Sequence, residues 1–286
     1  MLTVLIGLVA GLPQAYGDDM CAPASDSSRV AIAGGSITEI VYELGLEERL
    51  VAVDRTSNFP SAALELPSVG YVRNVSAEGV LSLSPTLVLG EDDMGPPATI
   101  EQLRATGIET RKLAEAHDIE GILDKVRCIA RIFGLDEQAQ QAAVDKYSPL
   151  LNQLAEVDQG TDIKAALVLS LADGVPMAGG ADTSAQGVLS MAGATNVFDE
   201  FTGWKPVSLE AMAASNPEFI VMPTRGLKAA GGREAVLQHP AVRLTPAGQK
   251  GQLIDIDGMT LLGFGPRTLD AAHRLAILFG TLSELR

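Results

Sequence analysis

The residues best suited to chemistry are Tyr71 and Arg73, which follow Gly70 in a predicted loop just before a helix start. A guanidinium close to a phenol favours the ionised phenolate form of tyrosine. A phenolate is a hard anionic ligand that suits ferric iron. The alternative is an ordinary loop tyrosine beside a surface arginine. The pair therefore indicates a candidate iron-ligand site that needs further support.

Two glutamates, Glu78 and Glu210, occupy matching places in a repeated pattern. Ser76-x-Glu78 is followed by Ser84-Pro85 and an apolar run, and Ser208-x-Glu210 is followed by Asn216-Pro217 and an apolar run. Each copy predicts a helix start and then a buried strand. A carboxylate in the first turn of a helix is favoured by the helix dipole, which is the ordinary explanation. The repeat also suggests one acidic tip per lobe, able to contact two basic sites on a dimeric partner.

What precedes the two copies differs, with Tyr71 and Arg73 before the first and Trp204 and Lys205 before the second. This difference is where a ligand site is expected.

Other chemistries find little support in the sequence. There is no Gly-x-Ser-x-Gly nucleophile motif, and no glycine pattern for a nucleotide phosphate. The run Glu91-Asp92-Asp93 could bind a cation, although a solvated loop is favoured. The histidines lie in or beside helical patterns, where surface or satisfied positions are expected; they are His117, His239 and His273.

Composition indicates which broad classes of protein the chain can belong to. The chain has 286 residues, is 47% hydrophobic and carries a net charge of −15. A sizeable core is therefore available. Nucleic acid is an unfavourable partner, because its phosphates require a Lys- and Arg-rich face.

Strand-like apolar runs alternate with helical patterns in two blocks, which predicts an α/β fold with two Rossmann-like lobes and parallel sheets. We expect an N-terminal lobe over residues 29–135, a single long helix over 137–157 that Pro149 could kink, and a C-terminal lobe over 161–286. Within the first lobe, Ser36 and Glu39 predict a capping box. Ligands of such sheets bind at the carboxyl ends of the strands, here in a cleft between the lobes.

The N-terminus and the cysteines complete the organisation. Residues 2–12 form an uncharged apolar run followed by small residues, which predicts a signal peptide over residues 1–17, with a buried strand or helix as the alternative. Cys21 and Cys128 lie in different settings, with Cys128 read as a core residue. This gives only weak indication of a disulfide and no metal-binding spacing.

The sequence resembles the periplasmic haem-binding proteins of bacterial haem-uptake ABC transporters. These belong to a larger group that binds haem, cobalamin or iron-siderophores. The matching stretches are residues 33–39, 69–73, 76–83, 177–180, 226–228, 231–233 and 261–267. The segments around Tyr71 and at residues 261–267 are the more specific to haem binders.

The resemblance implies roles for individual residues. Tyr71 would be the axial ligand of haem iron, Arg73 would donate to the ligand oxygen, and Arg225 would be a second arginine near it. Met177, Met259 and Phe264 would belong to the haem pocket. Glu78 and Glu210 would pair with arginines of the ABC permease dimer, which works with its ATPase at the inner membrane.

The resemblance further implies a monomeric periplasmic carrier with haem as its transported ligand. Some haem binders hold a second haem through a histidine in the C-terminal lobe, but the corresponding residues 171–180 contain none. One haem is therefore expected, or a second held by stacking or by Met177. A cobalamin or ferric-siderophore carrier is the alternative, and an α/β hydrolase or oxidoreductase is less favoured.

Overall fold

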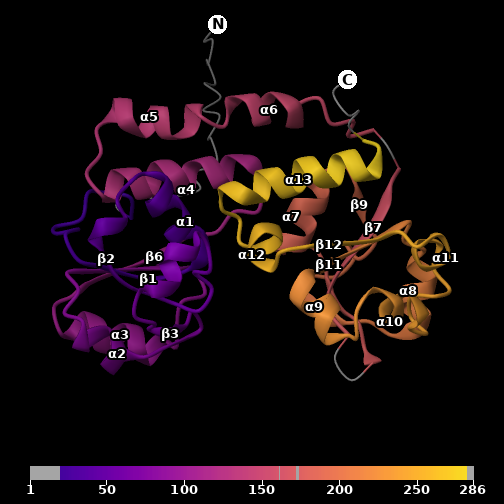
Figure 1. Cartoon of the computed structure of the whole chain (residues 1–286), viewed down its shortest axis with the longest axis horizontal. Helices are drawn as coiled ribbons and strands as arrows, with labels where there is room; N and C mark the ends of the chain where they lie inside the picture. The colour runs from indigo at the N-terminus through magenta and orange to yellow at the C-terminus, as the bar shows by residue number, and fades with distance from the viewer. Residues whose placement is uncertain (1–19, 161, 172–173, 282–286) are drawn as a thin grey trace, which may run out of the picture.

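The structure is a computed structural model that describes residues 20–160, 162–171 and 174–281. The predicted signal peptide lies outside the described residues. Figure 1 shows two α/β lobes side by side, with helices of the connecting segment running across both. The predicted fold class is confirmed. None of the described helices is long and apolar enough to cross a membrane.

The N-terminal lobe is built on a four-stranded parallel sheet in the order β2-β1-β5-β6. Its strands are β1 (Val30–Ala33), β2 (Leu50–Val53), β5 (Leu87–Glu91) and β6 (Glu109–Leu113), and its helices are α1 (Gly35–Glu43), α2 (Ala77–Ser82), α3 (Pro97–Ala105) and α4 (Ile119–Ile132). Alternate residues of β1 enter apolar clusters on opposite faces of the sheet, because helices cover both faces. Two short 3-10 helices, Glu47–Arg49 and Ser61–Glu65, flank β2.

A small hairpin projects between β2 and α2. It pairs β3 (Gly70–Tyr71) with β4 (Asn74–Val75) in antiparallel fashion.

The C-terminal lobe has a mixed sheet in the order β10-β8-β7-β11-β12, with β9 also paired to β7. Its strands are β7 (Lys164–Ser170), β8 (Met177–Gly179), β9 (Thr195–Asn196), β10 (Trp204–Pro206), β11 (Phe219–Pro223) and β12 (Leu253–Ile256). Strands β8 and β10 are antiparallel additions to a parallel centre. The expectation of an all-parallel sheet therefore holds for the first lobe and for the centre of the second.

The helices of the second lobe complete the βα pattern. They are α7 (Ser184–Met191), α8 (Leu209–Ser215), α9 (Thr224–Ala229), α10 (Arg233–Gln238), α11 (Pro246–Lys250), α12 (Gly258–Leu262) and α13 (Pro266–Phe279). In Figure 1, α13 begins beside the N-terminal lobe, where it meets α1 and α4, and runs away from that lobe beneath the connecting segment.

The connecting segment is two helices rather than the single long helix expected from the sequence. They are α5 (Glu137–Asp145) and α6 (Ser148–Leu154), with Pro149 in the first turn of α6. Proline lacks an N–H and its ring clashes with the carbonyl four residues earlier, so it ends the first helix at Asp145. Tyr147, at the break, packs against the cores of both lobes.

The sequence repeat corresponds to equivalent units of the two lobes. Ser76 and Ser208 cap α2 and α8 by accepting hydrogen bonds from the backbone N–H three residues on. Ser84 and Asn216, which precede the prolines, both have left-handed backbones, with φ of 47° and 55°. Both copies then enter a central strand, β5 or β11.

A disulfide joins Cys21 to Cys128, across 107 residues of sequence. Cys128 is buried on α4, as expected, but it is bonded. The local patterns gave little sign of this pair, because only the tertiary fold brings the two chain segments together.

Replacing both cysteines by serine should lower the free energy of unfolding by about 2–5 kcal/mol, because the unfolded chain regains the freedom of a long loop. Urea unfolding with and without reductant measures this. The reductant should destabilise the wild type and leave the double variant unchanged. Equal stability of all forms would contradict the expectation.

Candidate ligand-binding site

The loop after β2 is organised around one buried carboxylate, Asp54. Its Oδ1 accepts hydrogen bonds from the backbone N–H of Gly34 at 3.0 Å and the hydroxyl of Thr56 at 2.7 Å. Its Oδ2 accepts from the N–H of Val72 at 3.0 Å. Hydrogen bonds to an ionised acceptor are the stronger kind. Asp54 therefore fixes the start of α1, its own loop and the β3–β4 hairpin together.

Tyr71 stands on that hairpin with 39% of its surface exposed. Arg73 Nη1 donates to its hydroxyl at 3.2 Å, and Arg73 Nε pairs with Asp93 Oδ2 at 2.7 Å. Gly70 has φ 105°, and a Cβ there would lie 2.8 Å from the carbonyl oxygen of Asn74, so the hairpin needs glycine. The structure thus brings the predicted pair together and presents the phenol beside a cation.

The acidic run that begins at the last residue of β5 contributes to two ion pairs. Asp93 binds Arg73, whereas Glu91 is buried against Lys125 of α4, with Lys125 Nζ 3.3 Å from Glu91 Oε2. Lys125 Nζ also donates to Ser36 Oγ at 3.0 Å, and Ser36 Oγ donates to Glu91 Oε1. Burial raises the pKa of Glu91, against the charge of Lys125. The expectation of a wholly solvated loop is wrong for Glu91.

The predicted capping box is also wrong. Helix α1 has Gly34 at its N-cap and no side-chain cap. Ser36 is engaged by the buried carboxylate of Glu91, and Glu39 is engaged by an arginine 228 residues away.

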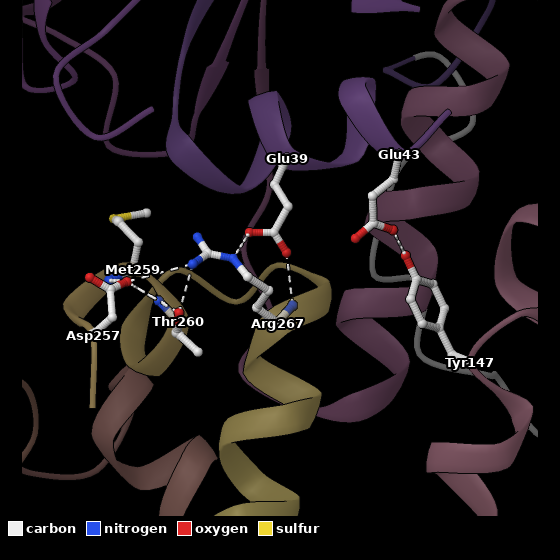
Figure 2. A network of polar contacts seen from close by, with 7 residues as sticks. All are labelled: Glu39, Glu43, Tyr147, Asp257, Met259, Thr260 and Arg267. Carbon is white, nitrogen blue, oxygen red and sulfur yellow. Dashed lines mark hydrogen bonds and ion pairs between the residues drawn. The ribbon is translucent and has the colours of Figure 1, made fainter. Parts of the chain in front are cut away.

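That arginine is Arg267, at the start of α13, and the pair joins the two lobes (Figure 2). Glu39 Oε1 accepts from the backbone N–H of Arg267 at 2.8 Å, and Oε2 accepts from Nε at 2.6 Å. Glu39 is 3% exposed. Burial raises its pKa, opposed by the hydrogen bonds and charge of Arg267.

Met259 of α12 also meets the N-terminal lobe. A Cβ built on Gly35 would lie 2.6 Å from Met259 Cε and 2.5 Å from the carbonyl oxygen of Thr56. The thioether is half-buried at the contact between the lobes, beside the loop of Asp54. Its predicted place in the ligand pocket is compatible with this geometry.

A pocket of about 460 Å³ opens between the lobes. Glu115 and His117, between β6 and α4, form one side; Asp182, Thr183, Gln186, Gly187 and Ser190, at and before α7, form the other. Gln186 Oε1 is buried and lacks a hydrogen-bond partner among the described residues. A polar interlobe pocket of this size falls in the range of small-molecule sites.

Glu115 and His117 are pocket residues that sequence reasoning missed. His117 Nε2 lies 3.5 Å from Glu115 Oε2. Burial alone would raise the pKa of Glu115, but the hydrogen bond from His117 and the charges of Lys125, His117 and Arg73 hold it below its usual value. The available signal was their position directly after a parallel strand, where ligands gather.

The other predicted residues have different settings. Phe264 is fully buried, with its ring centroid 4.8 Å from that of His117, so it supports the pocket from behind. Arg225 is exposed on α9, and Met177 is half-buried on β8. Their roles toward a ligand stay predictions.

Glu78 and Glu210 are exposed in the first turns of α2 and α8. Hydrogen bonds from its own backbone N–H and from the hydroxyl of Ser208 hold the pKa of Glu210 below its usual value. The position at matching helix starts is confirmed, and the docking role stays a prediction.

The fold and the interlobe pocket define a two-lobed ligand-binding protein. A family model for periplasmic binding proteins matches residues 30–260. The chain therefore belongs to the periplasmic binding protein family. It is a substrate-binding protein of ABC import and not an enzyme.

Three comparisons define its relatives. The solved structure of the periplasmic heme-binding protein BhuT in complex with two hemes is 34% identical, with a TM-score of 0.84, covering 90% of this chain and 100% of that one. An uncharacterized ABC transporter substrate-binding lipoprotein, YvrC, of Bacillus subtilis is 29% identical over 84% of this chain and 76% of its own. A vitamin B12-binding protein of Yersinia pestis is 29% identical over 70% of this chain and 71% of its own.

Replacing Lys125 by methionine should cost about 3–5 kcal/mol of stability at neutral pH, because Glu91 is left as an uncompensated buried charge. The pKa of Glu91, already raised by burial, rises further in the variant. A folded-state pKa above the unfolded value means that stability falls as pH rises past the unfolded value, so the loss should be larger at pH 8 than at pH 5.5.

Urea unfolding at the two pH values measures the effect. The Lys125→Met/Glu91→Gln double variant is the control, since it lacks the titrating carboxyl and should lose the extra pH dependence. A single variant as stable as wild type at both pH values would contradict the importance of this pair.

Proposed function

We propose that this protein binds ferric haem between its lobes through the Tyr71 phenolate and delivers it to an ABC permease for import. The observation that carries the proposal is the exposed Tyr71 hydroxyl, 3.2 Å from Arg73 Nη1, on a hairpin fixed by Asp54. An exposed phenol beside a fixed cation has the chemistry of an anionic iron ligand.

The charges around Tyr71 suit this role. Arg73 stabilises the phenolate and can donate to the ligand oxygen once iron is bound, while Asp93 holds the guanidinium in place. Asp93 also balances the positive charge of Arg73, so the bound ferric iron would not face an unpaired cation at this position. Tyr71 is the iron ligand in this proposal, and Arg225 of the opposite lobe would supply a second cation near the ligand.

The apolar part of the ligand also has a fitting environment. Haem is a flat apolar disc with carboxylates at one edge, and a site between two lobes can bury the ring and leave the carboxylates in water. Met259 offers a half-buried thioether at the lobe contact, and Met177, also in the C-terminal lobe, offers another half-buried thioether. The 34% identity to a heme-binding protein over nearly all of both chains supports this ligand class.

Delivery would use Glu78 and Glu210, one on each lobe, as contacts for basic residues of a permease dimer. Residues 1–17 would direct the chain to the periplasm. The docking part follows from the resemblance and from the exposure of both glutamates, and the targeting part follows from the uncharged apolar run at residues 2–12.

Cobalamin is the second candidate, because a vitamin B12-binding protein is among the relatives. The two ligands differ in whether they require Tyr71 as a metal ligand. Haem iron in this site needs a protein ligand on its axis, whereas a carrier of an iron-siderophore or cobalamin does not require Tyr71 as a ligand.

Titration of the signal-free protein with ferric haem should give a saturable Soret spectrum with the charge-transfer bands of tyrosine ligation. Tyr71→Phe should lose those bands and bind at least about tenfold more weakly, since one coordination bond is lost. Tyr42→Phe, at another tyrosine, is the matched control and should behave as wild type. A parallel titration with cyanocobalamin should give no saturable change.

Two outcomes would count against the proposal. Absence of a saturable haem spectrum in wild type would reject haem as the ligand. An unchanged spectrum in Tyr71→Phe would reject the ligand assignment.

Charge reversal at both tips, Glu78→Lys with Glu210→Lys, should weaken binding to the cognate permease in nanodiscs by about tenfold or more, because like charges then face the basic partner. Haem titration of the isolated variant should be unchanged. Glu137→Lys with Glu156→Lys is the matched control, because these exposed glutamates lie on the connecting segment, away from α2 and α8 (Figure 1). Equal weakening by both pairs would remove the docking assignment.

A further inference from the structure

Helix α1 connects the N-terminal lobe to two other parts of the molecule through glutamates one turn apart (Figure 2). Glu39 binds Arg267 of the C-terminal lobe. Glu43 accepts a hydrogen bond from the hydroxyl of Tyr147 and pairs with Lys146, both at the break between α5 and α6. One pair joins the lobes directly, and the other joins the N-terminal lobe to the connecting segment.

Arg267 contacts both lobes at once. Its Nη1 donates to Thr260 Oγ1 at 2.8 Å and lies 3.7 Å from Asp257 Oδ1, on the turn that carries Met259. Its guanidinium carbon lies 4.0 Å from the centroid of the Phe59 ring, in the N-lobe loop after β2. A cation at this distance from a ring face is attracted by the ring quadrupole. Arg267 therefore holds the turn of Met259 and the loop of Phe59 in fixed relation.

The Phe59 loop leads back to the proposed iron ligand. It begins at Asp54, whose carboxylate also accepts from Val72 of the Tyr71 hairpin. Phe59 itself is 42% exposed, so the N-lobe loops present an exposed aromatic ring as well as the phenol of Tyr71. The contacts of Arg267 thus extend, in two steps, to the backbone that carries Tyr71.

The pair of Glu39 and Arg267 is poorly explained as a source of stability. Burial raises the pKa of Glu39 despite the hydrogen bonds and charge of Arg267, so ionisation at neutral pH is less favourable in the folded protein than in the unfolded chain. Buried ion pairs can often be replaced by apolar residues at no loss. Because both carboxylate oxygens of Glu39 accept hydrogen bonds from Arg267, the pair does fix the orientation of α1 relative to α13.

We propose that Glu39 and Arg267 are positioning residues whose ion pair sets the spacing between the Tyr71–Phe59 wall and the Met259 wall of the ligand site. The ligand part of this inference rests on the proposed function, whereas the lobe spacing does not. A site held at its binding geometry avoids an ordering cost on binding and releases its ligand more slowly.

The test uses Glu39→Gln, which keeps the shape of the side chain and removes its charge. Haem loss to excess apomyoglobin should be about tenfold faster than from wild type. The tyrosine-ligated Soret spectrum should be unchanged, because Tyr71 is intact. The melting temperature of Glu39→Leu with Arg267→Met at pH 7 should be unchanged or higher than that of wild type, a result that a merely stabilising pair would not give.

Glu43→Gln is the matched control, with the same change of charge on the same helix but no contact with Arg267. It should leave haem loss unchanged. Glu39→Leu with Arg267→Met removes both charges together and should release haem as fast as Glu39→Gln, which guards against misfolding from an unpaired arginine.

A second readout needs no haem. Spin labels at Glu101→Cys and Lys250→Cys, both exposed and on different lobes, report the interlobe distance by pulsed electron paramagnetic resonance. Both native cysteines are in the disulfide and do not react. In the apo protein, Glu39→Gln should broaden the distance distribution, and Glu43→Gln should not.

An unchanged distribution and unchanged haem loss in Glu39→Gln, with a lower melting temperature of the double variant, would overturn the inference and leave an ordinary structural ion pair. A broadened distribution in a protein that binds no haem would support the lobe spacing and overturn the proposed function.

Discussion

The N-lobe side of the site depends on the burial of one carboxylate, Asp54, at the carboxyl end of β2. A buried carboxylate is tolerated only when donors surround it, and here they come from three chain segments. The start of α1, the loop of Thr56 and the Tyr71 hairpin must therefore converge on it. Because Glu39 lies on α1, the geometry around Tyr71 and the contact between the lobes share one anchor.

The two lobes show how one scaffold becomes an asymmetric site. Their central strands and capped helices are equivalent, but the segments before those helices are used differently. In the second lobe, Trp204 lies on β10 and pairs with Gly179 of β8, so this segment is part of the main sheet. In the first lobe, β3 and β4 pair as strands only with each other among the described residues and leave Tyr71 exposed. The antiparallel strands that distinguish the C-lobe sheet thus account for the absence of a second projecting hairpin among the described residues of that lobe.

Periodicity predicted much of the fold, because burial on both faces of a parallel sheet leaves clear apolar runs. The predicted alternation of strands and helices in two blocks agrees with the two lobes. Predictions from local sequence patterns were wrong where a residue distant in the sequence binds the side chain instead. Ser36 and Glu39 have the spacing of a capping box, yet Glu91 and Arg267 take their side chains. The disulfide, the pocket position of His117 and the Glu39 pair share this cause, since each depends on residues that only the tertiary fold brings together.

In the proposed haem site, the segment at residues 261–267 would act through the contact between the lobes. Phe264 has a left-handed backbone, with φ 46°, an arrangement that costs a non-glycine residue of order 1 kcal/mol or more. That turn lets Phe264 pack edge-on against His117 while Arg267, three residues further along the chain, binds Glu39. Both contacts reach the N-terminal lobe. A site formed between two lobes depends on their spacing as much as on its walls, so the residues that set that spacing can be as specific to a ligand as those that contact it.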